Sequence, residues 1–221
     1  MKHSTRKITA LYAIARVLLA IPLRLLCRVK VTGKEHVPLE GGCLVCPNHY
    51  SNMDAVLLGA VFPPKCQPYC IAKGELFRTP VVRSLVSGLG AIKVERNQSN
   101  VGALKAGMRM IENGQILVLF PQGKRCFGEN PADTVARPGA GMIATHCKCP
   151  VLPVCIKTKG MRFRLCKRTE IIIGEPISPE TICELSKEGK SYAEITNFIF
   201  DKVCSLGNFS PSSALQQESL S

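Results

Sequence analysis

Tryptophan is absent from this chain of 221 residues, and aromatic residues together make up only 5% of it. Acidic residues are also scarce, since 16 Asp and Glu stand against 29 Lys and Arg and leave a formal net charge of +13. Such an excess requires an anionic partner, which could be a nucleic acid, a membrane surface or a phosphorylated substrate. Single-strand nucleic-acid sites place stacking aromatics among their cations, and no recognisable nucleic-acid-binding motif occurs here. The composition therefore argues against nucleic acid and favours an anionic lipid surface, for a chain whose length suits one domain.

Long uninterrupted apolar runs are missing as well. A spanning helix needs about 20 apolar residues in a row, whereas residues 4–28 are interrupted by Arg16 and Arg24 and lack the small-residue cleavage site of a secretory signal. At about 100° per residue, the arginines of this segment share a sector about 120° wide; they are Arg6, Arg16, Arg24 and Arg28. Residues 1–28 are therefore predicted to form amphipathic helices, broken at Pro22, that lie in a membrane interface with their cations at lipid phosphates. The alternative is a helix packed on the domain with its arginines exposed.

Cysteine is plentiful, with 12 residues, but the chain is not the short, loop-rich secreted kind that builds a disulfide scaffold. Cys43-x-x-Cys46 and Cys147-x-Cys149 look like half-sites for zinc. A closed zinc site needs four ligands at recognisable spacing, and the first pair lies in a short apolar run where cysteine acts as a small hydrophobic residue. The sequence therefore predicts free thiols in a reducing cytosol and no bound metal.

From Val29 onward, short apolar runs alternate with longer segments of helical periodicity. The runs predict strands at residues 29–32, 43–46, 69–72, 92–94, 116–120, 152–156 and 169–173, where Pro153 suits a sheet edge or a bulge. Helices are predicted at residues 54–62, 79–87, 100–113, 140–146 and 191–205. This alternation is typical of an α/β fold with a largely parallel mixed sheet flanked by helices. The domain would cover residues 29–206, after the N-terminal membrane segment and before a Ser- and Gln-rich tail, 207–221, predicted to be disordered.

The sharpest local feature is the pair His49 and Asp54, between a predicted strand and a predicted helix. Residues five apart lie on different faces of a straight helix. The two side chains can therefore meet only if His49 lies in the loop and Asp54 in the first helical turn, which Ser51 or Asn52 would cap. A histidine held by a carboxylate is the base half of a catalytic triad, and the missing nucleophile could be a substrate hydroxyl. An ordinary capped helix with a loop histidine is the alternative.

Cations follow three other predicted strands. Lys124 and Arg125 come after an apolar strand and a Pro/Gly turn, in an arrangement that suits a phosphate, although an exposed basic turn is a common alternative. Lys73 and Arg96 follow two further strands. If these strands are neighbours, the four cations could converge on one anion.

The chain resembles the glycerolipid acyltransferases, and most closely their bacterial 1-acyl-glycerol-3-phosphate acyltransferase branch. Asn48-His49 through Asp54 matches the His-x4-Asp motif of that family, and Lys73–Leu76 with Gly90–Arg96 matches its second block. Phe120-Pro121-Gln122-Gly123-Lys124-Arg125 matches its Phe-Pro-Glu-Gly-Thr-Arg block, and Val151-Leu152-Pro153-Val154 its Val-x-Pro-Val block. Arg137–Ala140 and Gly174–Ile177 look like its later Gly-containing segments, in the same order from about Val29 to Ile177.

The resemblance implies acyl transfer from acyl carrier protein or coenzyme A to the 2-hydroxyl of 1-acyl-glycerol 3-phosphate (lysophosphatidic acid), at the cytoplasmic face of a membrane. His49 would be the base, Asp54 would orient it, Arg96 and Arg125 would bind the phosphate with help from Lys73 and Lys124, and no metal or other cofactor would be needed. Supporting motif positions would be Asn48, Gln122, Gly123 and Pro153. Another lysolipid acceptor, or a non-catalytic membrane-binding protein on the same fold, remains as the alternative.

Two positions depart from the family pattern. Gln122 stands where the family usually has Glu, and Lys124 where it usually has Thr. Gln122 keeps the capacity for hydrogen bonding without the negative charge, and Lys124 adds a positive one. Both changes make the turn more cationic, which favours a phosphate and weakens any role that requires a carboxylate there.

Overall fold

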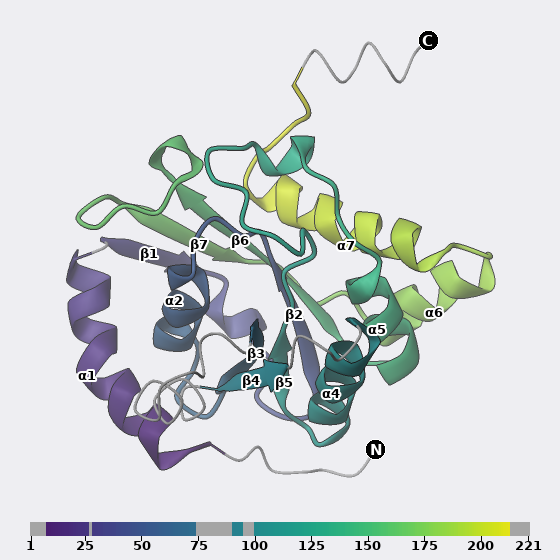
Figure 1. Ribbon diagram of the computed structural model, residues 1–221, viewed down its shortest axis with the longest axis horizontal. Helices are drawn as coiled ribbons and strands as arrows, with labels where there is room; N and C mark the ends of the chain where they lie inside the picture. The colour runs from purple at the N-terminus through teal and green to yellow at the C-terminus, as the bar shows by residue number, and fades with distance from the viewer. Residues whose placement is uncertain (1–7, 27, 74–89, 95–99, 213–221) are drawn as a thin grey trace.

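A seven-stranded mixed sheet forms the centre of the protein, in the order β1-β7-β6-β2-β5-β3-β4 (Figure 1). The computed structural model describes residues 8–26, 28–73, 90–94 and 100–212. The strands are β1 (Val29–Thr32), β2 (Cys43–Pro47), β3 (Pro68–Lys73), β4 (Ala91–Val94), β5 (Ile116–Val118), β6 (Val151–Thr158) and β7 (Thr169–Ile173). Neighbouring strands are parallel except for β6 and β7, which form an antiparallel hairpin. The predicted largely parallel α/β sheet is confirmed.

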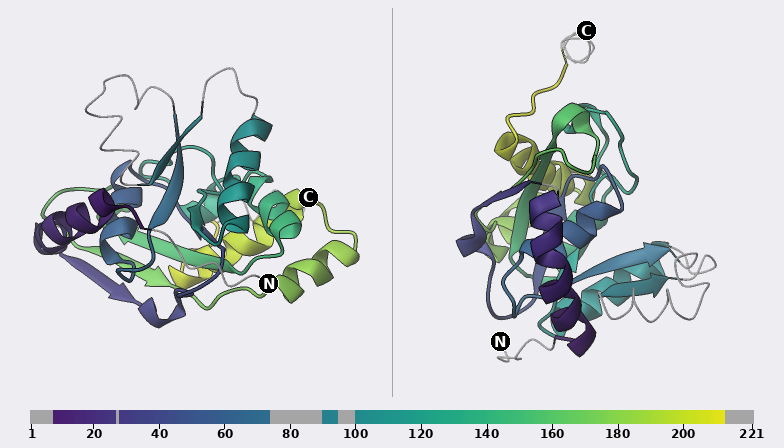
Figure 2. Two further views of the ribbon diagram at one scale, coloured as in Figure 1. Left: turned by 90° about the horizontal axis from the view of Figure 1, so that it is seen from below. Right: turned by 90° about the vertical axis from the view of Figure 1, so that its left-hand side faces the viewer.

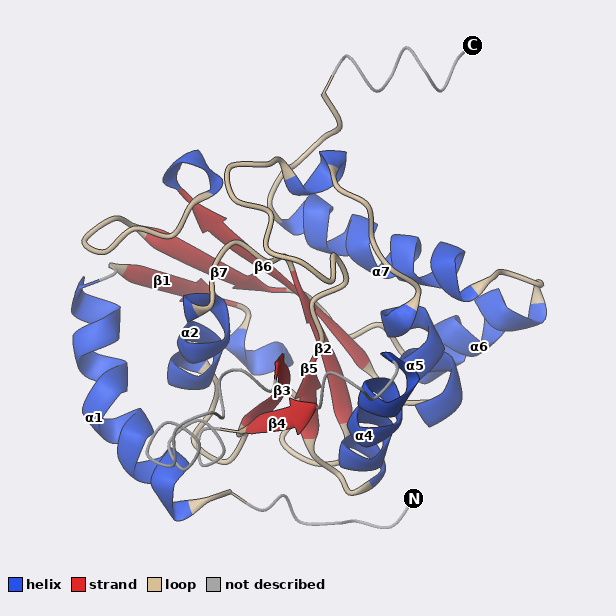
Figure 3. Cartoon of the chain, viewed as in Figure 1, coloured by secondary structure: helices blue, strands red, loops and turns tan. Residues whose placement is uncertain are grey.

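Helices cover both faces of this sheet, with α1 and α2 on one side and α4 to α7 on the other (Figures 2 and 3). They are α1 (Ala10–Leu26), α2 (Met53–Val61), α4 (Asn100–Glu112), α5 (Gly139–Cys147), α6 (Pro179–Lys187) and α7 (Tyr192–Leu206), with 3-10 turns η1 (Lys34–His36), η3 (Pro131–Asp133) and η4 (Lys159–Met161). The predicted helix 79–87 lies outside the described residues. Helix α6 was not predicted, although Ser178 caps it by accepting from the Thr181 N–H and Pro179 follows at the first helical position.

Alternate residues of β2 enter the two halves of the core. Cys43 and Val45 pack with α2, whereas Leu44 and Cys46 pack with α5 and α7. The interpretation of this run as a buried strand is confirmed, and it places the thiols of Cys43 and Cys46 on opposite faces of the sheet, where they cannot bind one metal ion. Burial raises the pKa of the Cys46 thiol well above its ordinary value. Within the described ranges, no group of three or more His, Cys, Asp or Glu side chains could hold a metal.

Helix α1 packs on α2 through the face that carries Tyr12 and Arg16, and Arg16 is one of the four arginines that were predicted to meet lipid phosphates. Tyr12 is 2% exposed and donates to the carbonyl of Gly59 at 2.9 Å. Arg16 donates from Nη2 to the carbonyl of Phe62 at 2.9 Å, where the C-terminal end of α2 attracts a cation. The predicted orientation is therefore wrong for Arg16, because an unpaired helix-end carbonyl holds its guanidinium inside the protein. Arg6 and the side chain of Arg24 lie outside the description.

The opposite face of α1 is apolar and exposed. Ile14, Val17, Leu18 and Leu25 are 57%, 67%, 65% and 72% exposed, respectively. Pro22 lies inside the single helix and does not divide it as predicted. No helix in the described part of the chain is both long enough and apolar enough to span a membrane.

Two further predictions need correction. Pro153 lies in β6, which is an interior strand and not an edge. The sheet accommodates a residue without an N–H here because β7 ends at Ile173, opposite Val154. The next residue, Gly174, donates its N–H to the Pro153 carbonyl. The start of the predicted disordered tail is folded onto the domain. Phe209 donates its N–H to the carbonyl of Cys204, and Ser212 donates its N–H to Asp133.

Candidate active site

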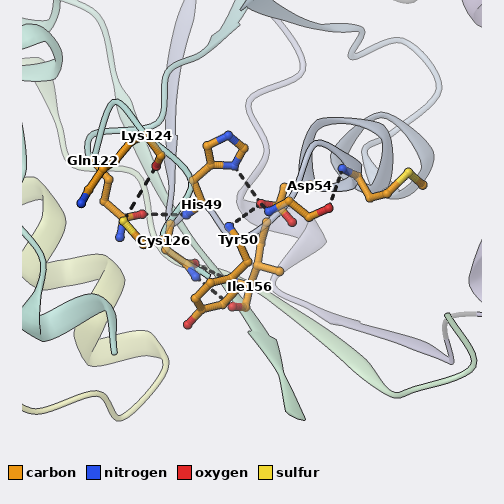
Figure 4. A network of polar contacts seen from close by, with 10 residues as sticks. His49, Tyr50, Asp54, Gln122, Lys124, Cys126 and Ile156 are labelled. Carbon is orange, nitrogen blue, oxygen red and sulfur yellow. Dashed lines mark hydrogen bonds and ion pairs between the residues drawn. The ribbon is translucent and has the colours of Figure 1, made fainter. Parts of the chain in front are cut away.

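The two strands that carry the main motifs lie side by side and end at the same edge of the sheet. β2 pairs in parallel with β5, with Val45 opposite Val118. His49 therefore follows the end of β2 next to the segment Leu119–Gln122 that follows β5, and Asp54 lies in the first turn of α2. This is the loop-and-first-turn arrangement that the sequence predicted for His49 and Asp54. Figure 4 shows how their side chains meet.

Asp54 binds three donors through one oxygen. Its Oδ2 accepts from the backbone N–H groups of Tyr50 and Ser51, both at 2.7 Å, and lies 2.9 Å from Nδ1 of His49. Because this oxygen is already an acceptor for two N–H groups, Nδ1 must carry the proton that it shares with Asp54. Asp54 is fully buried, so the carboxylate fixes both the loop backbone and the imidazole tautomer.

The other ring nitrogen of His49, Nε2, faces outward as a free acceptor. It makes no hydrogen bond to any residue that the structure describes, and the side chain is 15% exposed. Phe120 stacks on the ring, with the two ring centroids 3.7 Å apart and an angle of 19° between the planes. The imidazole is therefore held from one face and one edge, with its unprotonated nitrogen available to an incoming hydroxyl.

Asn48 joins the end of β2 to β6. Its amide donates from Nδ2 to the carbonyl of Ile156 at 3.0 Å and accepts at Oδ1 from the Ile156 N–H at 2.7 Å. A fully buried side chain thus replaces two backbone groups of a strand ladder. The predicted supporting position has a physical role, which is to fix the chain one residue before His49.

Gln122 holds the backbone of His49 from the other side. Its Oε1 accepts from the His49 N–H at 2.7 Å, and its Nε2 donates to Oγ1 of Thr134 at 2.8 Å. Thr134 in turn donates its hydroxyl to the carbonyl of Pro131 at 2.7 Å. The side chain is 1% exposed, so the neutral amide that replaces the family's Glu has a matched partner for each of its two polar atoms.

The basic turn after β5 lies against the same loop. Gly123 has φ +65° and the Arg137 side chain lies directly over it, since a Cβ at this position would be 2.6 Å from Cδ of Arg137. Cys126 donates its N–H to the carbonyl of His49 at 2.8 Å. Lys124 and Arg125, between these two residues, are exposed. The structure thus places both predicted cations at the rim of the His49 site and adds Arg137 to them.

The two remaining predicted cations are less fully described. Lys73 is the last residue of β3, which pairs with β5, so its backbone lies at the same sheet edge as His49; its side chain is outside the description. Arg96 lies outside the described residues altogether. The convergence of all four cations on one anion stays a prediction.

Sequence reasoning missed three residues around His49, namely Phe120, Thr134 and Arg137. Phe120 stands directly before the Pro-Gln-Gly turn, so its position in the motif was a usable signal. Arg137 stands before a Pro-Gly pair at the start of α5, which was noticed only as part of a resemblance. Thr134 carried no signal, because its contact with Gln122 arises from the fold of the loop between β5 and α5.

Comparisons with known proteins identify a family and a shared fold. The Acyltransferase family model matches residues 28–157. The chain is 29% identical over 163 residues to a 1-acyl-sn-glycerol-3-phosphate acyltransferase of Bacillus subtilis, covering 72% of this chain and 79% of that protein. It is 26% identical to the protein of the same name from Saccharomyces cerevisiae, covering 83% of this chain and 62% of the yeast protein. The crystal structure of the 1-acyl-sn-glycerophosphate (LPA) acyltransferase of Thermotoga maritima superposes with a TM-score of 0.63 at 22% identity, over 88% of this chain and 81% of that one, and shares its fold.

Proposed function

The chain belongs to the Acyltransferase family, and from this premise we propose that it transfers a fatty acyl group from a thioester to the 2-hydroxyl of 1-acyl-glycerol 3-phosphate, which gives phosphatidic acid. The observation that carries the proposal is the His49–Asp54 pair, 2.9 Å apart, with Nε2 of His49 free. A base of this kind without a neighbouring protein nucleophile suits direct attack by a substrate hydroxyl. The names of the Bacillus and yeast relatives support this acceptor.

In the proposed reaction, Nε2 of His49 removes the proton from the acceptor hydroxyl as the oxygen attacks the thioester carbonyl. Asp54 stabilises the imidazolium that forms and keeps the ring in place, and Phe120 prevents it from tilting. Collapse of the tetrahedral intermediate releases the thiolate of coenzyme A or of acyl carrier protein, which takes the proton from His49. A thioester is already activated, so the reaction requires no metal or further cofactor.

The phosphate of the acceptor would bind at the rim of the site. Arg125 offers two parallel N–H donors and Lys124 a point charge, on the turn that Gln122 and Cys126 tie to His49. Because Gln122 is neutral, neither cation is offset by a carboxylate at the position where the family usually has Glu. Arg96 and Lys73 would complete this set.

Membrane association would follow from α1. Its exposed apolar side chains, Ile14, Val17, Leu18 and Leu25, cover the face opposite to Tyr12 and Arg16. Such a face is suited to lie in the acyl boundary of a bilayer while the other face stays on the domain. We place the protein at the cytoplasmic surface of a membrane, where its acceptor is also found.

The test is an assay of purified protein with lysophosphatidic acid and either acyl-coenzyme A or acyl carrier protein thioester. Phosphatidic acid should form, and monoacylglycerol, which differs only by the missing phosphate, should be a poor acceptor. Equal turnover of both acceptors would contradict the phosphate assignment. Preference for a different lysophospholipid would support the same chemistry with another acceptor.

A further inference from the structure

The loop between β6 and β7 is the most basic segment that the proposed reaction does not use. Residues 157–168, here called the basic hairpin, contain six Lys or Arg and no Asp or Glu. Lys159, Arg162, Arg164, Lys167 and Arg168 are exposed. Across the described ranges of the chain, the only carboxylate paired with any of these cations is Glu170, 2.6 Å from Arg168. Such a concentration of unpaired charge indicates an anionic partner.

Core packing and backbone hydrogen bonds hold the basic hairpin in place. Phe163 packs against the core on the α2 side of the sheet. The carbonyl of Met161 accepts from the Gly128 N–H at 2.9 Å, and the Lys167 N–H donates to the carbonyl of Arg164 at 3.2 Å. With these residues anchored, Leu165 is left 59% exposed among the cations. The segment is therefore a supported surface that presents charge around one apolar side chain.

This surface continues that of α1. β1 pairs in parallel with β7, with Val29 opposite Thr169, so that Arg28, just after the end of α1, lies beside Arg168. Figures 1 and 2 show the hairpin loop at the same end of the molecule as the C-terminal end of α1. On its other side, the Gly128–Met161 hydrogen bond joins the hairpin to the segment that follows β5, residues 119–130, here called the active-site loop, in which Phe127 is 49% exposed.

We propose that the basic hairpin is a second membrane contact, which binds anionic lipid headgroups through its cations and places Leu165 at the edge of the acyl region. The proposal rests on the proposed function, in which α1 already lies in the bilayer surface. A membrane is favoured over an acidic protein because the surface is continuous with the exposed apolar face of α1 and carries an apolar residue of its own. With both α1 and the basic hairpin in contact with the membrane, the orientation of the active-site loop above the bilayer would be fixed.

The test compares two full-length variants with equal loss of charge. In the first, Lys159→Gln, Arg164→Gln and Lys167→Gln remove three of the six positive charges of the basic hairpin. In the control, Lys105→Gln, Lys148→Gln and Lys187→Gln neutralise exposed lysines on the elements of the other sheet face. Both are measured by co-sedimentation with vesicles of phosphatidylcholine alone or mixed with phosphatidylglycerol, over a range of salt concentrations.

Each cation near an anionic surface contributes about a fivefold factor in partitioning. The hairpin variant should therefore bind the anionic vesicles on the order of 100-fold more weakly than the unmodified protein, and its binding should depend less on salt. The control variant should change far less, and both should keep the binding to neutral vesicles that α1 provides. Unchanged thermal unfolding would show that the hairpin variant is folded, and Leu165→Asn alone should weaken binding to both kinds of vesicle.

Three results would overturn the proposal. The hairpin variant could bind anionic vesicles as the control does, or the unmodified protein could show no preference for them. The hairpin variant could instead bind vesicles normally but lose turnover with acyl carrier protein and not with acyl-coenzyme A, which would assign the surface to an acidic carrier protein. Turnover of a short-chain, water-soluble lysophosphatidate by the unmodified protein tests the proposed reaction separately, and its failure would leave the vesicle result intact.

Discussion

Asp54 makes more contacts at the site than its motif predicts. The His-x4-Asp spacing correctly predicted that Asp54 would meet His49, because only a loop followed by a first helical turn can bring the two together. The spacing did not predict that the same oxygen also accepts from the N–H groups of Tyr50 and Ser51. These contacts depend on the path of the loop backbone, which side-chain periodicity does not record.

Replacement of His49 and replacement of Asp54 should reduce turnover to different extents. His49→Ala removes the base and should abolish turnover, whereas Asp54→Asn should lower kcat by roughly 10²–10⁴. The amide of Asn can keep an acceptor toward the loop but provides no charge for the imidazolium. Steady-state kinetics with circular dichroism on both variants would check this. Near-normal kcat in folded His49→Ala protein would contradict the mechanism.

Gln122→Glu tests why this chain has an amide in the motif turn. A carboxylate could still accept from the His49 N–H, but it would add a negative charge beside His49 and favour the imidazolium. We expect the acid limb of the pH profile of kcat/KM to move to higher pH.

Thr134→Val is the matched control for Gln122→Glu. It leaves Nε2 of Gln122 without its acceptor, which costs about 1–3 kcal/mol of folding free energy for a buried polar group, but it introduces no charge. Stability should fall while the pH profile stays in place. A profile unchanged in Gln122→Glu would show that the charge at this position does not reach His49.

Arg125→Ala should act on the acceptor and spare the donor. Loss of a charge-assisted contact of about 1.5–3 kcal/mol should raise the KM for lysophosphatidic acid roughly 10- to 150-fold, with little change in the KM of the thioester. Lys187→Ala, on α6, is the control of equal charge. An unchanged acceptor KM would move the phosphate to other residues, such as Arg137, whose side chain lies against Gly123 of the same turn.

At the scale of elements, the sequence predicted the strands better than it predicted how the elements face one another. Apolar runs marked all seven strands. The signal was strongest in β2, β5 and β6, which are buried along most of their length and so have apolar residues on both faces. α6 was missed because its helical stretch is short and mostly polar. The prediction for Arg16 was wrong because a pattern of arginines shows which residues share a face of a helix but not which neighbour that face meets. Arg16 donates to the carbonyl of Phe62, and the apolar side of α1 is exposed.

The two faces of α1 should respond differently to mutation. Leu18→Glu with Leu25→Glu should release the protein from neutral vesicles without lowering its thermal stability, since both side chains are already exposed. Tyr12→Ala should instead destabilise the fold by about 3 kcal/mol, because it empties a buried position and removes the hydrogen bond to Gly59. Vesicle sedimentation and thermal unfolding of both variants distinguish the faces. Retained vesicle binding by the folded double variant would contradict the membrane role of α1.

At the scale of the molecule, the order of the strands in the sheet could not be predicted from the sequence. β1 pairs with β7 across most of the chain, and β5 lies between β2 and β3. Hydrophobic periodicity predicts that a strand exists but not its neighbour, so the meeting of the motif loops at one sheet edge could be expected only from the resemblance. The same order joins α1 to the basic hairpin, a relation for which the sequence offers no sign.

The buried thiols make a prediction for the whole fold. Burial raises the pKa of Cys149, Cys155 and Cys204 to about 12, whereas an unfolded thiol has a pKa of about 8.5. The folded protein thus favours the neutral thiols, so their contribution to stability is complete below about pH 8.5 and is lost as the pH rises toward 12.

The denaturant midpoint should consequently fall between about pH 8.5 and 11, and the fall should be smaller in Cys149→Ala protein, which carries one such thiol fewer. At pH 8, a thiol reagent should react quickly with exposed Cys166 and only slowly with these buried cysteines, while unreduced, denatured protein should react at all 12. Cys166→Ser should remove a fast-reacting thiol and leave the alkaline loss of stability unchanged, because that loss comes from the buried thiols. Rapid labelling of the buried thiols in the native protein, or a midpoint equal at pH 7 and pH 11, would show that the core does not exclude solvent from these cysteines as the fold requires.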